Sequence, residues 1–98
     1  MKKNVRAHII VEGLVQGVLF RASMADVART HKVCGWAKNN PDGTVEAVIE
    51  GDEPSVKKVI AWSRVGPPAA RVDKVDLKWE DYKDEFDDFT ALTRWNSY

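Results

Sequence analysis

The stretch VRAHIIVEGLVQGVLFRASMADVARTH, residues 5–31, carries the two patterns from which the fold can be inferred. Apolar residues occupy every second position from Val5 to Val11, which predicts a strand with one buried face. The alternation breaks at a glycine-containing loop, and apolar residues then return at helical spacing. This second pattern predicts an amphipathic helix from Phe20 to about His31. The stretch is therefore expected to form a strand, a loop and a helix.

Further along the chain, one turn is marked by its residue types. In Asn40-Pro41-Asp42-Gly43, proline presets the second position of a turn and glycine accepts the left-handed conformation at its end. A turn of this kind joins the two strands of a hairpin. The elements expected after the first helix are a strand at residues 36–39, a returning strand at 45–49, a helix that Asp52 caps and Gly66-Pro67-Pro68 ends, a strand at 75–79 and a short fifth strand at 89–95.

The resulting order, β-α-β-β-α-β, is the ferredoxin-like arrangement of an α+β fold, a two-layer α/β sandwich. We expect an antiparallel sheet with two helices on one face and a short fifth strand. In this arrangement the first two strands run parallel with the third between them, so their carboxyl ends lie at the same edge of the sheet. The loop at residues 13–20 and Asn39 should therefore face one pocket.

Composition limits the classes of protein to which the chain can belong. Residues 1–98 are expected to form a single domain. Lys and Arg number 15, as do Asp and Glu, and this balance argues against a sequence-independent nucleic-acid binder. Cys34 is the only cysteine, so we expect a cytoplasmic protein in a reducing compartment. Charged residues, including Arg6 and Glu12, interrupt the first apolar stretch, which excludes a signal-peptide core or a membrane span there.

The loop that leads from Gly13 into the helix has the composition of an anion-binding site. Glycines allow successive backbone N–H groups to point at one anion, and the helix N-terminus adds unpaired donors and a partial positive charge. Arg21 lies in the first helical turn, where a cation is unfavourable unless an anion sits against it. Its guanidinium can also form two hydrogen bonds to a phosphate. Residue types alone leave a connecting loop with a surface arginine as an open alternative.

Asn39 also allows two interpretations. Its amide can hold a water molecule by donating and accepting hydrogen bonds, or it can support the adjacent turn, as Asn40 is expected to do. His8 and His31 are expected to be structural or solvated, the four tryptophans to be core or half-buried packing residues, and residues 80–88 to form a solvated acidic loop. No Cys/His spacing typical of a zinc site occurs, so no metal or cofactor is expected.

Two segments resemble the signatures of the acylphosphatase family. Residues 13–21, GLVQGVLFR, are similar to the first signature, Gly-x-Val-Gln-Gly-Val-x-Phe-Arg, at every fixed position. Residues 35–45, GWAKNNPDGTV, are similar to the second, and residues 66–72 resemble the link to the fourth strand. Leu19 stands where many bacterial members have glycine. The resemblance implies Arg21 and Asn39 as the catalytic pair, and a phosphate-binding set made of Gln16, Gly17, Val18, Leu19, Phe20 and Arg21.

The same resemblance implies hydrolysis of the carboxyl-phosphate bond of acyl phosphates by a monomer, without a metal or cofactor. Arg21 and the backbone of residues 16–20 would hold the phosphate, Asn39 would orient water, and inorganic phosphate or sulfate would compete with the substrate. The alternative is a module that binds an acyl or carbamoyl phosphate without efficient turnover. An RNA-recognition module shares the element order, but its aromatic-rich signature is missing from residues 44–50. We therefore expect neither a nucleic-acid partner nor a membrane.

Overall fold

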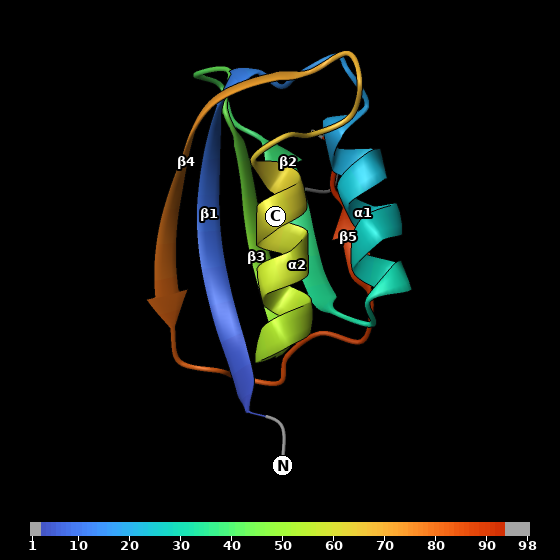
Figure 1. Ribbon diagram of the computed structural model, residues 1–98, viewed down its shortest axis with the longest axis vertical. Helices are drawn as coiled ribbons and strands as arrows, with labels where there is room; N and C mark the ends of the chain where they lie inside the picture. Colours follow the sequence, from blue (N-terminus) through green and yellow to red (C-terminus); the bar gives the residue numbers. More distant parts are fainter. Residues whose placement is uncertain (1–2, 94–98) are drawn as a thin grey trace.

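The computed structural model describes residues 3–93, which form five strands and two helices (Figure 1). Their order confirms the ferredoxin-like α+β fold expected from the sequence. The fifth strand is shorter than predicted: Thr93 lies beyond it, and Trp95 falls outside the described residues. The elements are β1 (Asn4–Leu14), α1 (Phe20–Thr30), β2 (Cys34–Asn39), β3 (Val45–Asp52), α2 (Glu53–Ser63), β4 (Arg71–Glu80) and β5 (Phe89–Ala91).

The strands lie in the order β4-β1-β3-β2-β5. β3 is antiparallel to both β1 and β2, so β1 and β2 run parallel on either side of it, as expected. The expectation of an antiparallel sheet is wrong for β5, which runs parallel to β2 and makes the sheet mixed. The reason is the path of residues 81–88, which cross from one edge of the sheet to the other along the end where β4 finishes and β2 starts (Figure 1).

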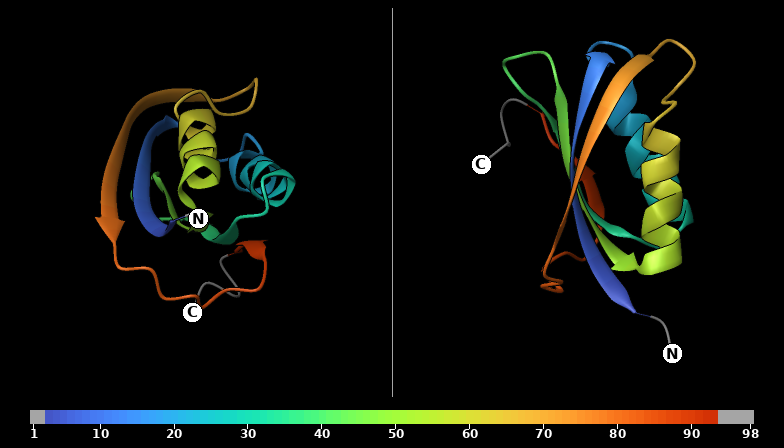
Figure 2. Two further views of the ribbon diagram at one scale, coloured as in Figure 1. Left: turned by 60° about the horizontal axis from the view of Figure 1, so that its bottom comes forward. Right: turned by 60° about the vertical axis from the view of Figure 1, so that its left-hand side comes forward.

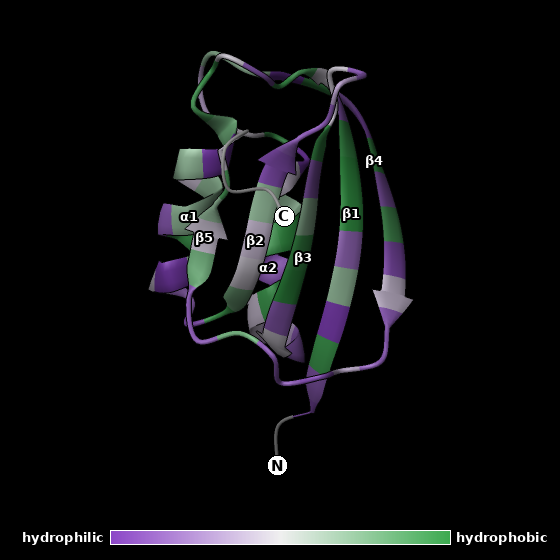
Figure 3. Ribbon diagram, turned by 180° about the vertical axis from the view of Figure 1, so that it is seen from behind, coloured by the Kyte–Doolittle hydropathy of each residue, from purple (hydrophilic) through white to green (hydrophobic). Residues whose placement is uncertain are grey.

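The two helices cover one face of the sheet, and the core lies between these layers (Figure 2). The inward residues of β1 have relative exposures of 0% at Ala7, Ile9 and Val11, as their alternation predicted. The opposite face of the sheet is open. Along β1, polar residues such as Arg6 and His8 alternate with the buried apolar residues (Figure 3). Among the largest fully buried side chains are Phe20, Phe89, Ile9, Met24 and Ile49.

The hairpin between β2 and β3 forms at the predicted turn. The Asp42 carboxylate accepts hydrogen bonds from the Thr44 backbone N–H at 3.0 Å and from the Thr44 hydroxyl at 2.7 Å. Gly43 adopts a φ of 93°, which a residue with a side chain rarely adopts. Two backbone hydrogen bonds close the turn: Asn40 N–H donates to the Thr44 carbonyl, and Gly43 N–H donates to the Asn40 carbonyl. The turn therefore fixes where β2 ends, and with it the place of Asn39.

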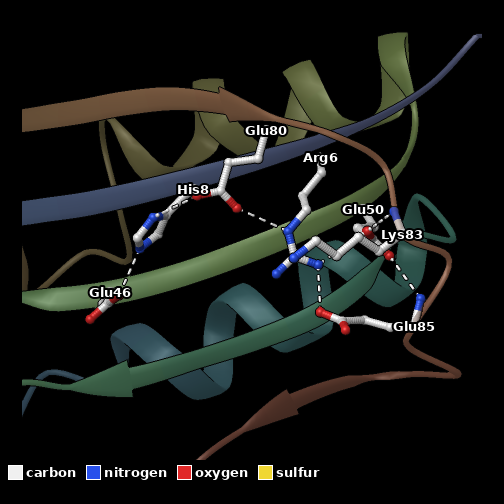
Figure 4. Close-up of polar contacts among 7 residues, drawn as sticks. All are labelled: Arg6, His8, Glu46, Glu50, Glu80, Lys83 and Glu85. Atoms are coloured by element: carbon white, nitrogen blue, oxygen red, sulfur yellow. Dashed lines mark hydrogen bonds and ion pairs between the residues drawn. The ribbon is translucent and has the colours of Figure 1, made fainter.

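The open face carries a partly buried group of charges, here called the Arg6 cluster: Arg6, Glu50, Glu80 and Glu85 (Figure 4). The Arg6 guanidinium lies 3.2 Å from the Glu50 carboxylate, 3.0 Å from that of Glu80 and 2.6 Å from that of Glu85. The side chains of Arg6 and Glu50 are only 9% and 3% exposed. Because the charges of Arg6 and Glu50 are paired and hydrogen-bonded, these two side chains can be buried on a face that is otherwise open.

The Arg6 cluster holds the segment at residues 81–88 against the sheet. The Glu50 carboxylate accepts hydrogen bonds from the backbone N–H groups of Lys83, at 2.8 Å, and Glu85, at 3.2 Å. Most side chains of this segment are exposed, as predicted for a solvated loop, but its path is fixed by contacts that were not predicted. Since β5 follows this segment directly, the cluster also positions the edge of the sheet that borders the pocket described below.

The three tryptophans among residues 3–93 are partly buried to different degrees. Trp36 and Trp62 are partly buried, and the rings of Trp62 and Phe20 have centroids 5.3 Å apart. Trp79, on the edge strand β4, is 45% exposed and is therefore half-buried, which the expectation for the tryptophans allowed. Among the strands of residues 3–93, β4 has a neighbour on one side only, which leaves more of its surface to solvent than a central strand would.

Candidate active site

One pocket of about 370 Å³ lies where the loop between β1 and α1, the end of β2 and the end of β5 meet. It brings together the residues predicted from two separate segments, because the parallel strands β1 and β2 end at the same edge of the sheet. Of the expected phosphate-binding set, Gln16 and Val18 are not in its lining. The lining residues are Val15, Gly17, Leu19, Phe20, Arg21, Ala22, Asn39, Ala91 and Thr93.

The loop into α1 has the backbone geometry of an anion-binding site. Gly17 and Leu19 have φ angles of 75° and 65°, while Val18 between them does not adopt a positive φ. Alternation of this kind turns successive N–H groups toward a common point. Within residues 3–93, the N–H groups of residues 16–19 have no acceptor. The first helical bond of α1 runs from Ser23 N–H to Leu19 O, so the donors of residues 20–22 precede it.

Arg21 projects from the second position of α1 and is anchored to the opposite side of the pocket. Its Nη1 donates to the carbonyl oxygen of Leu92, just beyond β5. That residue is itself held by a hydrogen bond of 2.8 Å from its N–H to the Ala37 carbonyl of β2. α1 has no acidic residue in its first turn. The guanidinium is therefore oriented by backbone, and its charge adds to the positive helix terminus rather than being neutralised there.

Asn39 is the last residue of β2, and its side chain is exposed at the pocket. No group within residues 3–93 hydrogen-bonds its amide. The amide of its neighbour Asn40, in contrast, donates to the Thr44 hydroxyl at 3.0 Å and supports the turn, as predicted. The two asparagines thus have different environments: one stabilises the hairpin, and the other presents a donor and an acceptor to the pocket.

Gln16 has a structural contact that sequence reasoning missed. Its side-chain Nε2 donates to the backbone carbonyls of Asn40, at 2.8 Å, and Thr44, at 2.9 Å. These bonds tie the loop before α1, which carries Gly17, to the turn that follows Asn39. Val18, the other expected residue outside the lining, packs against the core. The position of Gln16 within the first signature was the only signal that it mattered, and it did not reveal the partner.

Comparison with known proteins finds similarity to one family over nearly the whole chain. Residues 7–91 match the family model described as Acylphosphatase. The chain belongs to the acylphosphatase family. An acylphosphatase of Pyrobaculum calidifontis is 61% identical over 89 residues, which cover 90% of this chain and 81% of that protein.

Two solved acylphosphatase structures have the same fold. That of Coxiella burnetii superposes with a TM-score of 0.86 at 35% identity, covering 91% of this chain and 93% of the other. That of Bacillus subtilis also gives a TM-score of 0.86, at 31% identity, covering 90% and 98% respectively. This chain is accordingly an enzyme that hydrolyses the carboxyl-phosphate bond of small acyl phosphates.

The pocket of this acylphosphatase contains no carboxylate or imidazole among its described lining residues. His8 lies on the open face of the sheet, with its ring nitrogens 2.6 Å from Glu46 and 3.3 Å from Glu80 (Figure 4). His31 is at the end of α1. Neither histidine is thus placed to act as a general base. Within residues 3–93 no group of three or more His, Cys, Asp or Glu side chains could hold a metal ion, and no helix is long and apolar enough to cross a membrane.

Proposed function

We propose that Arg21 and the backbone N–H groups of residues 16–20 hold the phosphoryl group of the acyl phosphate, while Asn39 orients the attacking water. The observation that carries this proposal is the pairing of unsatisfied groups in one pocket. The first set is a run of backbone donors with the Arg21 guanidinium, and the second is the Asn39 amide, which has no hydrogen-bond partner among the described residues. An anion would satisfy the first set, and a water molecule would satisfy the second.

In the proposed reaction, water attacks phosphorus in line with the bridging oxygen. The P–O bond to the acyl group breaks, the carboxylate leaves with the bonding electron pair, and inorganic phosphate forms. The proton of the attacking water passes to a phosphate oxygen, since no carboxylate or imidazole is among the described residues that line the pocket. A carboxylate is a good leaving group, so the enzyme chiefly has to position the reactants and stabilise charge on the phosphoryl oxygens.

Asn39→Ala tests this assignment. Turnover should fall by about 10²–10³, the cost of losing one preorganised polar group that acts in the transition state. Phosphate affinity and the urea midpoint of unfolding should remain near those of the parent, because the amide has no partner in the described residues. Single-turnover kinetics, phosphate titration and urea unfolding measure the three quantities.

Asn40→Ala is the matched control. It removes an amide of the same kind, one position along, that bonds the Thr44 hydroxyl in the turn. Loss of this bond should cost about 1 kcal/mol of unfolding free energy and leave most of the turnover. If Asn39→Ala turns over substrate at the parent rate, Asn39 does not orient the water. If it binds phosphate as the parent does but no longer turns over, the assignment is supported.

We also propose that the protein is a cytoplasmic monomer. Cys34, as the single cysteine, suits a reducing compartment, and the open face of the sheet bears ion pairs in place of a continuous apolar surface. Sedimentation equilibrium over a range of concentrations should give the mass of one chain. A mass that rises toward that of two chains would refute the monomer.

A further inference from the structure

Leu19 has two properties that folding stability does not explain. It adopts the left-handed conformation, with φ 65° and ψ 27°, at the N-cap of α1. For a residue with a side chain this conformation costs on the order of 1 kcal/mol, and glycine or asparagine would adopt it more readily. Its side chain is also 75% exposed and does not belong to the hydrophobic core or its flanking residues. A leucine here is therefore unfavourable for the backbone and contributes little to packing.

Leu19 lines the pocket, and several of the other lining residues are apolar. Ala22 and Ala91 line the same pocket, as does Val15, which is 1% exposed. The polar groups of the lining are chiefly Arg21 and Asn39, to which the proposed function assigns the phosphoryl group and the water. In an in-line displacement the acyl oxygen leaves on the side opposite the water. The acyl group must then extend away from Asn39, and the surfaces that remain for it are the apolar ones.

We propose that Leu19 is a specificity-determining residue whose side chain contacts the acyl group of the substrate and favours large apolar acyl groups, aromatic or branched aliphatic, over acetyl. This inference rests on the proposed function. Covering an exposed leucine with an apolar acyl group removes apolar surface of both from water, which lowers the free energy of the bound state. An acetyl group is too small to gain much from this contact. The contact with the acyl group would thus offset the conformational cost of a leucine at this position.

The experiment compares kcat/KM for benzoyl phosphate and acetyl phosphate in the parent, Leu19→Asn and Leu19→Gly. Both substitutions accept the left-handed conformation, so the fold should be retained. Because Leu19 also contributes a backbone N–H to the site, the readout is the ratio of the two substrates, in which any change common to both cancels. The ratio of benzoyl to acetyl phosphate should fall by about tenfold, the low end of what one apolar contact gives in a binding pocket.

The loss should appear in KM for benzoyl phosphate, since the contact is made before and during the reaction alike. Val65→Asn is the matched control, because Val65 is a 72% exposed aliphatic residue outside the pocket lining. It should leave the ratio unchanged. An unchanged ratio in both Leu19 variants, including an equal loss on the two substrates, would overturn the inference while leaving the proposed function intact. A parent protein that hydrolyses neither substrate would instead refute the proposed function.

Discussion

Glu50→Ala should be among the most destabilising single substitutions on the open face of the sheet. The Glu50 side chain is 3% exposed and accepts three hydrogen bonds: from Arg6 at 3.2 Å, from Lys83 N–H at 2.8 Å and from Glu85 N–H at 3.2 Å. Alanine removes all three acceptor contacts. Arg6 keeps Glu80 and Glu85 as partners, so its charge is not left unpaired.

The expected loss follows from these contacts. Each of the two backbone N–H groups loses its acceptor at a cost of about 1 kcal/mol, toward the low end because water can reach this exposed segment. Removing one carboxylate from the buried guanidinium costs about 1 kcal/mol more, well below the cost of breaking an isolated buried pair. The free energy of unfolding should therefore fall by about 3 kcal/mol. For a domain of this size that loss lowers Tm by roughly 12–24 °C.

Urea unfolding followed by circular dichroism gives the free energy directly. Glu50→Gln should lose less than Glu50→Ala, because its amide oxygen can still accept from one of the N–H groups. Hydrogen exchange should accelerate at the amides of both Lys83 and Glu85 in Glu50→Ala, and at one of the two in Glu50→Gln. Asp73→Ala is the control, because its ion pair with Arg71 is solvent-exposed and should contribute nothing measurable. A Glu50→Ala protein within about 1 kcal/mol of the parent would refute the view that the Arg6 cluster holds residues 81–88.

Arg21→Lys should lower kcat/KM nearly as much as Arg21→Ala, because lysine keeps the charge but loses the planar guanidinium that bonds two phosphate oxygens. Steady-state rates close to the parent's in the lysine variant would mean that charge alone suffices. Inorganic phosphate or sulfate should compete with substrate and raise Tm, since a ligand of the folded state stabilises it. An equal rise in Arg21→Ala would place the anion elsewhere. Turnover should survive exhaustive chelation, as no metal-binding group occurs within residues 3–93; activity that only a divalent ion restores would contradict this. Acid should destabilise the protein in part through Glu80. The hydrogen bond from Arg6 lowers the pKa of this carboxyl, so its contribution is present above the unfolded pKa and is lost as pH falls through the folded pKa. The stability difference between the parent and Glu80→Gln, measured by urea unfolding, should shrink between about pH 6 and about pH 3. A difference independent of pH would identify another group.

The sequence predicted the parts of this fold that are governed by local patterns. Alternation from Val5 to Val11 predicted which face of β1 is buried, and the residue types at 40–43 predicted the hairpin. The proximity of Arg21 and Asn39 followed from topology alone, since two parallel strands end at one edge. The strand and the turn could be predicted because each depends on residues that are close together in the sequence. The pocket could be predicted because the order of these elements sets the direction of the strands.

The unpredicted features depend on contacts between distant residues. Arg6 meets Glu50 and Glu85 across separations of 44 and 79 residues, and a surplus of carboxylates does not indicate which of them a buried arginine will bind. The parallel direction of β5 depends on the path of residues 81–88, which those same contacts fix. The left-handed backbone of Leu19 was also missed, because leucine disfavours that conformation and only its place in the signature, where many bacterial members have glycine, pointed to it.

The position of β4 at the edge of the sheet has a consequence for solubility during storage and expression. An edge strand of this length offers a row of unpaired backbone groups to which another chain could add, the first step of amyloid-like aggregation. Here the outward positions of β4 carry charges of both signs. A chain approaching this edge would have to strip water from them, which opposes recruitment of further strands. These charged side chains are Arg71, Asp73, Lys74, Asp76 and Lys78, and all of them are exposed.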